Sequence, residues 1–196
     1  MWQRITSSLA TSLKKRIRYS KSSLKRTSFE LYESAVDNLE YMTFFKQLQM
    51  PDTLYSWYLV TELHVWMMMV RVMREENHGR FLRNSLSEIL WRDIEARIKA
   101  LGDTSSKVIR TNTSEIHEQF QAAIFNYDEG VLGSDCVLAG ALWRRILNRQ
   151  MDVKNMETMV HYVRGTLYMM DAVPSEQLIM KPSDCFSWLR LNGLKV

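Results

Sequence analysis

The stretch LVTELHVWMMMV, from Leu59 to Val70, constrains the fold more than any other part of the chain. On a helix, with 100° between successive residues, the segment 54–73 has no continuous polar face. A helix that is apolar on all sides is either the central helix of a globular core or a membrane span. A span would place Glu62 near the bilayer midplane, at a cost of roughly 2.5–3.5 kcal/mol, with His64 beside it. The sequence therefore predicts a central core helix.

Two polar side chains inside this stretch are candidate functional residues. Burying Glu62 is costly unless it is paired, and no residue of its own helix is an obvious partner. It is expected to be paired from elsewhere in the core or to lie in an exposed groove that awaits a partner protein. His64 and Met68 share one helix face, but residues one turn apart cannot be the two opposite axial ligands of a haem. We therefore expect His64 to be a core histidine that hydrogen-bonds a carbonyl or a carboxylate.

The rest of the body shows the apolar periodicity of amphipathic helices. Only seven glycines and three prolines occur in 196 residues, which is few for the frequent turns of a β-sandwich. Helices are predicted at about 29–49, 54–76, 81–101, 115–127, 135–149 and 155–170, with a short helical turn near 186–191. We predict an all-α fold, a single compact domain of about six helices around the central apolar helix.

The first 28 residues differ in composition from the body. They contain eight of the 26 Lys and Arg residues and no acidic residue, which leaves 18 basic against 22 acidic side chains in the remainder. A basic, serine-rich and amphipathic segment is typical of a mitochondrial transit peptide. The alternative is a basic tail that binds anionic lipid or RNA. The predicted organisation is a targeting-like extension over 1–28 and a helical domain over 29–196.

No catalytic or metal-binding motif is apparent. His117 and Glu118 begin like the HExxH motif, but residue 121 is Gln, and no P-loop, GxGxxG or GxSxG is present. Cys136 and Cys185 are far apart in the sequence and lack CxxC spacing. We therefore predict that the protein is not an enzyme and has no cofactor and no metal site.

In addition to the two polar residues of the central helix, two further groups of residues are candidate partner-binding positions. Tyr127, Asp128 and Glu129 are predicted to form a turn between two helices, where recognition residues are often found, although a plain connector is the alternative. Arg144, Arg145, Arg149 and Lys154 are a candidate basic patch for RNA. The alternative is that the three arginines belong to an ordinary solvated face of one helix.

Four blocks of sequence resemble the ubiquinol–cytochrome c chaperone family, in order and in spacing. They are PDTLYSWYLVTELHVWM from Pro51, GRFLRNSLSEILWRDIEAR from Gly79, YDEGVLGSDCVLAGALWRRI from Tyr127 and VHYVRGTLYMMD from Val160. The resemblance covers about residues 41–172. It implies a helical protein that assembles mitochondrial respiratory complex III, at the matrix side of the inner membrane and peripheral to it.

The same resemblance implies two partners, a small partner assembly factor and newly made cytochrome b, near the exit of the mitochondrial ribosome. A body rich in Met and Trp can supply an adaptable apolar surface for such a client. No specific nucleic acid is implied. The residues leave two alternatives open. One is an RNA- or ribosome-binding helical module that uses the basic patch, and the other is a small enzyme or haem-binding protein that uses His64 and Glu62.

Overall fold

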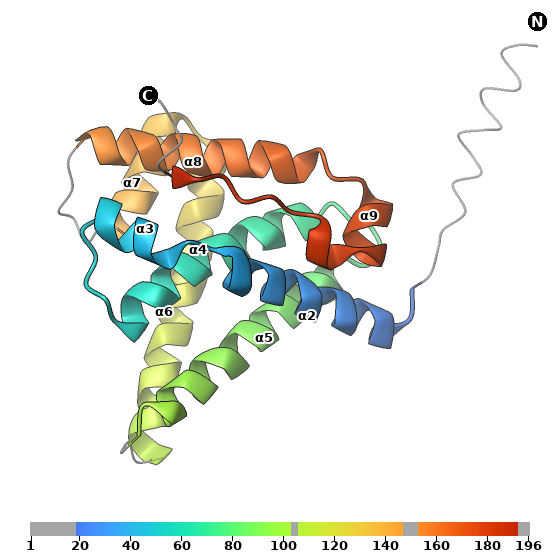
Figure 1. Ribbon diagram of the computed structural model, residues 1–196, viewed down its shortest axis with the longest axis horizontal. Coiled ribbons are helices and arrows are strands. Elements are labelled where there is room, and N and C mark those ends of the chain that lie inside the picture. The colour runs from blue at the N-terminus through green and yellow to red at the C-terminus, as the bar shows by residue number, and fades with distance from the viewer. Residues whose placement is uncertain (1–18, 103–105, 147–152, 192–196) are drawn as a thin grey trace, which may run out of the picture.

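The computed structural model describes residues 19–102, 106–146 and 153–191, and in the second range the side chains from residue 114 onward. Within these ranges the chain forms eight α-helices, one 3₁₀ helix and no strand (Figure 1). They are α2 (Lys21–Asn38), α3 (Tyr41–Gln47), α4 (Leu54–Val72), α5 (Gly79–Ala100), α6 (Ser106–Leu132), α7 (Asp135–Arg145), α8 (Val153–Asp171), α9 (Ser175–Met180) and η1 (Pro182–Asp184). The predicted all-α class is confirmed.

The central helix is α4, as the sequence predicts. Fifteen of its 19 residues are buried, and it packs against α2, α3, α5 and α8. Thr53 caps its first turn, because the Thr53 hydroxyl accepts a hydrogen bond from the Ser56 backbone N–H at 3.2 Å. Among the described helices, α4 included, none combines the length and the apolar character that a membrane span needs. The core interpretation of the opening stretch is therefore confirmed.

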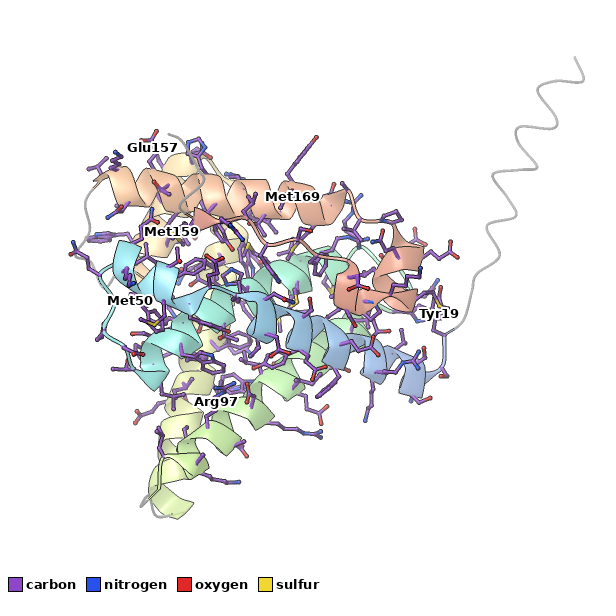
Figure 2. All side chains as sticks on the ribbon, viewed as in Figure 1. Tyr19, Met50, Arg97, Glu157, Met159 and Met169 are labelled. Carbon is purple, nitrogen blue, oxygen red and sulfur yellow. The ribbon has the colours of Figure 1, made fainter. Side chains whose placement is uncertain are left out.

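The remaining helices surround α4 in pairs. α2 packs on α5, α6 packs on α7, and α7 packs on α8, while the segment after α8 returns along α2 through α9 and η1 (Figure 1). Figure 2 shows side chains filling the spaces between these helices, among them Met159, which has no exposed surface. Methionines and aromatic residues from several helices thus share one core with α4.

The folded domain begins earlier than the predicted boundary after residue 28. α2 begins at Lys21, and Leu24 and Thr27 of its first turns are buried. The Thr27 hydroxyl donates a 3.0 Å hydrogen bond to the Ile179 carbonyl of α9. The boundary was placed too late because the exposed basic residues of this helix look like part of the basic extension. Residues 1–18 lie outside the described part of the chain, and a targeting role for the extension stays a prediction.

Several predicted helix ends differ from the observed ones. The predicted helix over 29–49 is two helices, because the backbone at Leu39 and Glu40 leaves the helical conformation. α6 continues to Leu132, so the predicted turn that starts at residue 128 is helical, and the chain turns at Gly133 and Ser134 instead. In the tail, α9 and η1 form between residues 175 and 184, whereas residues 186–190 are irregular and not the predicted helical turn.

Candidate functional site

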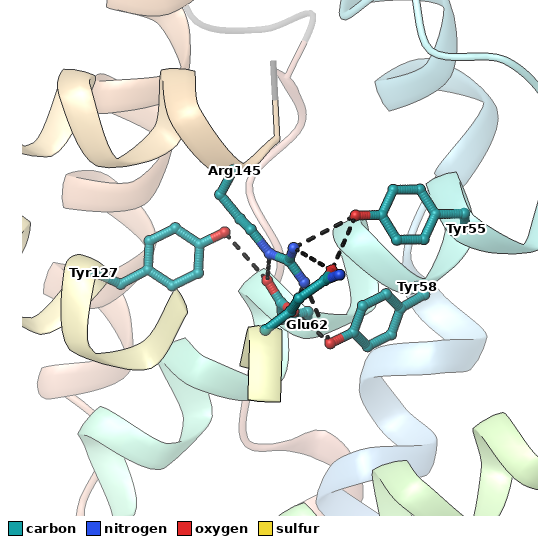
Figure 3. Close-up of polar contacts among 6 residues, drawn as sticks. Tyr55, Tyr58, Glu62, Tyr127 and Arg145 are labelled. Atoms are coloured by element: carbon teal, nitrogen blue, oxygen red, sulfur yellow. Dashed lines mark hydrogen bonds and ion pairs between the residues drawn. The ribbon is translucent and has the colours of Figure 1, made fainter. Parts of the chain in front are cut away.

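A buried ion pair joins the middle of α4 to the end of α7. The Glu62 side chain has no exposed surface, and Arg145 approaches both of its oxygens. Arg145 Nε lies 2.8 Å from Glu62 Oε1, and Arg145 Nη2 lies 2.6 Å from Glu62 Oε2 (Figure 3). A planar guanidinium can donate two parallel hydrogen bonds in this way, which gives the pair both strength and a fixed orientation. The ion pair therefore offsets the cost of burying Glu62, and its cation comes from a residue 83 positions away in the sequence.

Two tyrosines complete the hydrogen bonding of the Glu62 carboxylate. Tyr58, one turn earlier in α4, donates to Glu62 Oε2 at 2.5 Å, and Tyr127 of α6 donates to Glu62 Oε1 at 3.4 Å. Burial, followed by the negative charge of Glu62, raises the pKa of both tyrosines well above the ordinary value. Both phenols therefore stay protonated and act as donors. The expectation that its own helix offers Glu62 no good partner was wrong, because Tyr58 is one.

The outer edge of the cluster reaches solvent. Arg145 Nη1 donates to Gln119 Oε1 at 3.1 Å and to the Tyr55 hydroxyl at 3.4 Å (Figure 3). Burial lowers the pKa of Arg145, but the hydrogen bonds and charge of Glu62 outweigh it and the net shift is upward. The arginine is therefore always charged. We call Tyr55, Tyr58, Glu62, Gln119, Tyr127 and Arg145 the central polar cluster; it ties α4, α6 and α7 together.

His64 lies in the core and forms two hydrogen bonds of its own. Its Nδ1 is 2.7 Å from the Val60 carbonyl oxygen, and its Nε2 is 2.7 Å from the Tyr162 hydroxyl of α8. A carbonyl can only accept, so Nδ1 carries the proton and Nε2 accepts from Tyr162. Burial lowers the pKa of His64 to about 4, which keeps the ring neutral at physiological pH. The predicted core histidine bonded to a carbonyl is confirmed.

Tyr127, Asp128 and Glu129 belong to the last turns of α6 and not to a loop. Gly130 suggested a turn in the sequence, but here it permits close helix packing: an added Cβ would lie 3.0 Å from the Leu138 Cα of α7. Tyr127 has no exposed surface. The Tyr127 ring is therefore part of the core and does not lie on a surface loop, whereas Glu129 is exposed.

Asp128 holds the indole of the central helix. It is exposed at the surface of α6 and accepts a hydrogen bond from Trp66 Nε1 at 2.8 Å. The Trp66 ring also packs against Tyr127, with 5.0 Å between ring centroids. One side of Asp128 therefore supports the core, and its position at the surface leaves it accessible to another protein.

The structure thus divides the predicted site residues into three groups. Glu62, Tyr127 and Arg145 come together in the interior, and His64 forms a separate buried contact with α8. Asp128, Glu129 and Arg144 are exposed. Of the candidate basic patch, Arg145 points into the protein while Arg144 and Lys154 are exposed, and Arg149 lies outside the described residues.

Tyr58, Gln119 and Tyr162 were missed by the sequence analysis. Tyr58 could have been found, because a residue four positions before Glu62 lies on the same face of a helix. The contacts of Gln119 and Tyr162 depend on how distant helices pack, and no local pattern indicates them. Among the described residues, no group of three or more His, Cys, Asp or Glu side chains is placed to hold a metal ion.

The fold and the central polar cluster define a helical protein in which buried polar side chains of α4, α6 and α7 pair with one another and fix the packing of these helices. The chain belongs to the ubiquinol-cytochrome C chaperone family, whose sequence model matches residues 46–185. This confirms the resemblance seen in the four sequence blocks.

Relatives with curated names agree with this assignment. The chain is 44% identical over 181 residues to the ubiquinol-cytochrome c reductase complex assembly factor 1 of Drosophila melanogaster, covering 90% of this chain and 69% of the relative. It is 36% identical to the Homo sapiens factor of the same name, covering 84% and 55%. With the mitochondrial protein CBP3 of Saccharomyces cerevisiae it shares 28% identity, covering 68% and 41%. The chain thus spans about half the length of the human relative and less of the yeast one.

A solved structure shares the fold. The crystal structure of the Cbp3 homolog from Brucella abortus superposes with a TM-score of 0.74 and covers all of both chains, at 16% sequence identity. At that identity the similarity establishes the helical architecture alone.

Proposed function

We propose that this protein is an assembly chaperone for the mitochondrial ubiquinol–cytochrome c reductase complex, respiratory complex III. The observation that carries the proposal is the match to the chaperone family over most of the helical domain. The high identity with a named assembly factor of the same complex supports it further.

The finer proposal is that the protein binds newly made cytochrome b together with a small partner assembly factor, at the matrix side of the inner membrane. A client that is itself apolar and helical needs an apolar surface on its chaperone. Phe125 and Leu132 lie seven residues apart on one face of α6, and their side chains are 72% and 88% exposed. Because seven residues make two helical turns, these two exposed apolar side chains lie on one face of α6, two turns apart, and we call this pair the stripe.

The exposed charges next to this stripe are the candidate contacts that remain from the sequence analysis. Asp128 and Glu129 lie between Phe125 and Leu132 on α6, and Arg144 lies on α7. We propose that these three residues contact a partner directly. Glu62, His64, Tyr127 and Arg145 would act indirectly, by holding α4, α6, α7 and α8 in the arrangement that presents the stripe.

The two alternatives receive less support from the geometry. Haem ligation through His64 would require breaking one of two 2.7 Å hydrogen bonds in the core. RNA binding through a basic patch loses Arg145, whose guanidinium pairs with Glu62. Binding of the mitochondrial ribosome stays a separate prediction, since it need not use this patch.

Complementation tests the proposal. The corresponding gene is removed from cells, and the full chain is returned to them. The expected result is that assembled ubiquinol–cytochrome c reductase is lost on native gels and restored by the full chain, while the other respiratory complexes are unchanged in amount before secondary effects develop. Normal assembly of the reductase in cells that lack the protein would refute the proposal.

A further inference from the structure

A groove of about 360 Å³ lies between the C-terminal halves of α4 and α6, next to the start of α5. Its lining includes Trp66 and Met69 from α4, Met73 directly after α4, Arg83 from α5, and Asp128 and Leu132 from α6. We call it the α4–α6 groove. It is distinct from the central polar cluster, which lies toward the N-terminal half of α4.

The groove has a rigid floor and an apolar rim. Trp66 is buried at the floor, where the hydrogen bond to Asp128 fixes its indole. Met73 and Leu132 stand at the rim with 43% and 88% of their surface exposed. Methionine side chains adapt to the shape of an incoming group, and exposed apolar residues grouped around a groove mark sites of protein contact. The groove is therefore suited to receive a few apolar side chains from another molecule.

The shape of the groove favours a helix as its occupant. Met69 of α4 and its C-cap residue Met73 are one helical turn apart, and Asp128 and Leu132 are one turn apart on α6. Both walls therefore have the ridge spacing into which a third helix packs. An extended peptide would need a free strand edge for its backbone groups, and the described residues contain no strand. A helix pairs its own backbone groups and has no such need.

The charged residues that line the groove indicate which kind of helix it can bind. Arg83 lies on the α5 side, and within the described part of the chain its side chain takes part in no ion pair or hydrogen bond. Asp128 and the exposed Glu129 lie on the α6 side. An anionic lipid surface would meet these two carboxylates and be repelled. A helix with a carboxylate beside its apolar face can turn that group to Arg83 and away from α6.

We propose that the α4–α6 groove binds an amphipathic helix of a partner protein, with apolar side chains one turn apart seated on Trp66 and Met69 and a carboxylate paired with Arg83. The inference rests on the proposed function, because it assigns a binding surface to the protein partner of an assembly chaperone. The occupant is a separate protein, and not lipid, a second copy of the chain or another segment of the same chain.

Site-specific photo-crosslinking in the full chain tests the occupant. A photoreactive phenylalanine analogue replaces Leu132 or Met73, and the matched control position is Leu101, a leucine directly after α5 that is 71% exposed. In intact mitochondria, positions 132 and 73 should crosslink to a peptide with helical apolar spacing and at least one Asp or Glu, from a subunit or an assembly factor of the reductase. Adducts with lipid only, with residues 1–18 of the same chain or with a second copy would overturn the proposal, as would equal crosslinking at position 101.

Surface variants test the energetics without disturbing the core. Leu132→Asp should reduce co-purification of the crosslinked partner about tenfold or more, and Leu101→Asp should leave it unchanged, with equal thermal unfolding of both. Arg83→Glu should weaken the complex, and replacing the partner's carboxylate with Lys should restore it.

The two proposals fail in different ways. If Leu132→Asp and Arg83→Glu retain the partner and support normal reductase assembly, the groove inference is wrong while the proposed function stands. If the wild-type chain itself fails to restore reductase in complementation, the proposed function is wrong.

Discussion

Arg145 near the end of α7 forms a two-point ion pair with the fully buried carboxylate of Glu62 in the middle of α4, with N–O distances of 2.8 Å and 2.6 Å. The two residues are 83 positions apart, and the pair fixes α7 against the core. A buried carboxylate without its cation would be strongly unfavourable, so this contact couples the position of α7 to the stability of the whole domain.

Arg145→Leu should therefore lower the free energy of unfolding by about 3–5 kcal/mol, because it leaves the charge of Glu62 buried with only two phenols to stabilise it. The measurement is urea unfolding followed by circular dichroism. Arg144→Leu, at the exposed neighbouring position, is the matched control and should change stability by less than about 0.5 kcal/mol. In the double variant Glu62→Leu with Arg145→Leu, most of the loss should be recovered. Equal stability of the Arg144 and Arg145 variants would show that the ion pair is not structural.

Because of His64, the free energy of unfolding should fall as the pH is lowered. Burial lowers its pKa from 6.5 to about 4, so the unfolded chain binds a proton between these values and the folded chain does not. The stabilisation by the neutral ring is complete above pH 6.5 and is lost as the pH falls toward 4, by about 3 kcal/mol in total. His64→Gln should flatten the pH dependence in this window, whereas the exposed His161→Gln should leave it in place. A profile that is the same in both variants would contradict this assignment.

Trp66→Ala should destabilise the protein by about 3–5 kcal/mol, because it removes the largest fully buried side chain and leaves a cavity beside Tyr127. Tyr168→Ala removes an aromatic ring that is 80% exposed and should have an effect below about 0.5 kcal/mol. Thermal or urea unfolding of the two variants makes the comparison. A small effect at Trp66 would contradict its place in the core.

Two truncations should separate targeting from folding. Removal of residues 1–18 should leave a stable helical domain, whereas removal of residues 1–28 should destabilise it. The longer deletion takes away buried Leu24 and the Thr27 hydrogen bond to Ile179. Circular dichroism and thermal unfolding measure the fold, and fusion of residues 1–28 to a reporter measures import. A cytosolic reporter would refute the targeting prediction, and equal stability of the two truncated proteins would refute the structural one.

The sequence predicts much of the fold because its signals are local. The apolar run of α4 identifies the central helix, and the i, i+4 charge pairs of α5, such as Asp93 with Arg97, form as helical spacing requires. Helix ends are harder to predict, because glycine occurs both in turns and where two helices approach closely. Gly130 resembles a turn residue and instead lets α6 and α7 approach, so the end of α6 was predicted about five residues too early.

The candidate site could be predicted only in part. A buried acid in α4 demands a partner, and the sequence indicates that need without identifying Arg145. Arg144 and Arg145 are adjacent and chemically identical, and only the packing of α7 on the core decides which one points inward. The α4–α6 groove has no sequence signature, because its walls come from three helices whose mutual placement is a property of the tertiary fold.

The most direct test of the central claim is affinity purification of the tagged full chain from mitochondria after brief labelling of mitochondrial translation products. We predict that labelled cytochrome b is enriched in the eluate over every other labelled product. A small partner protein, which need not carry the label, should be present in the same eluate. Recovery of the tagged protein with cytochrome b no more enriched than the other products would contradict the claim that this protein is a chaperone of complex III assembly acting on newly made cytochrome b.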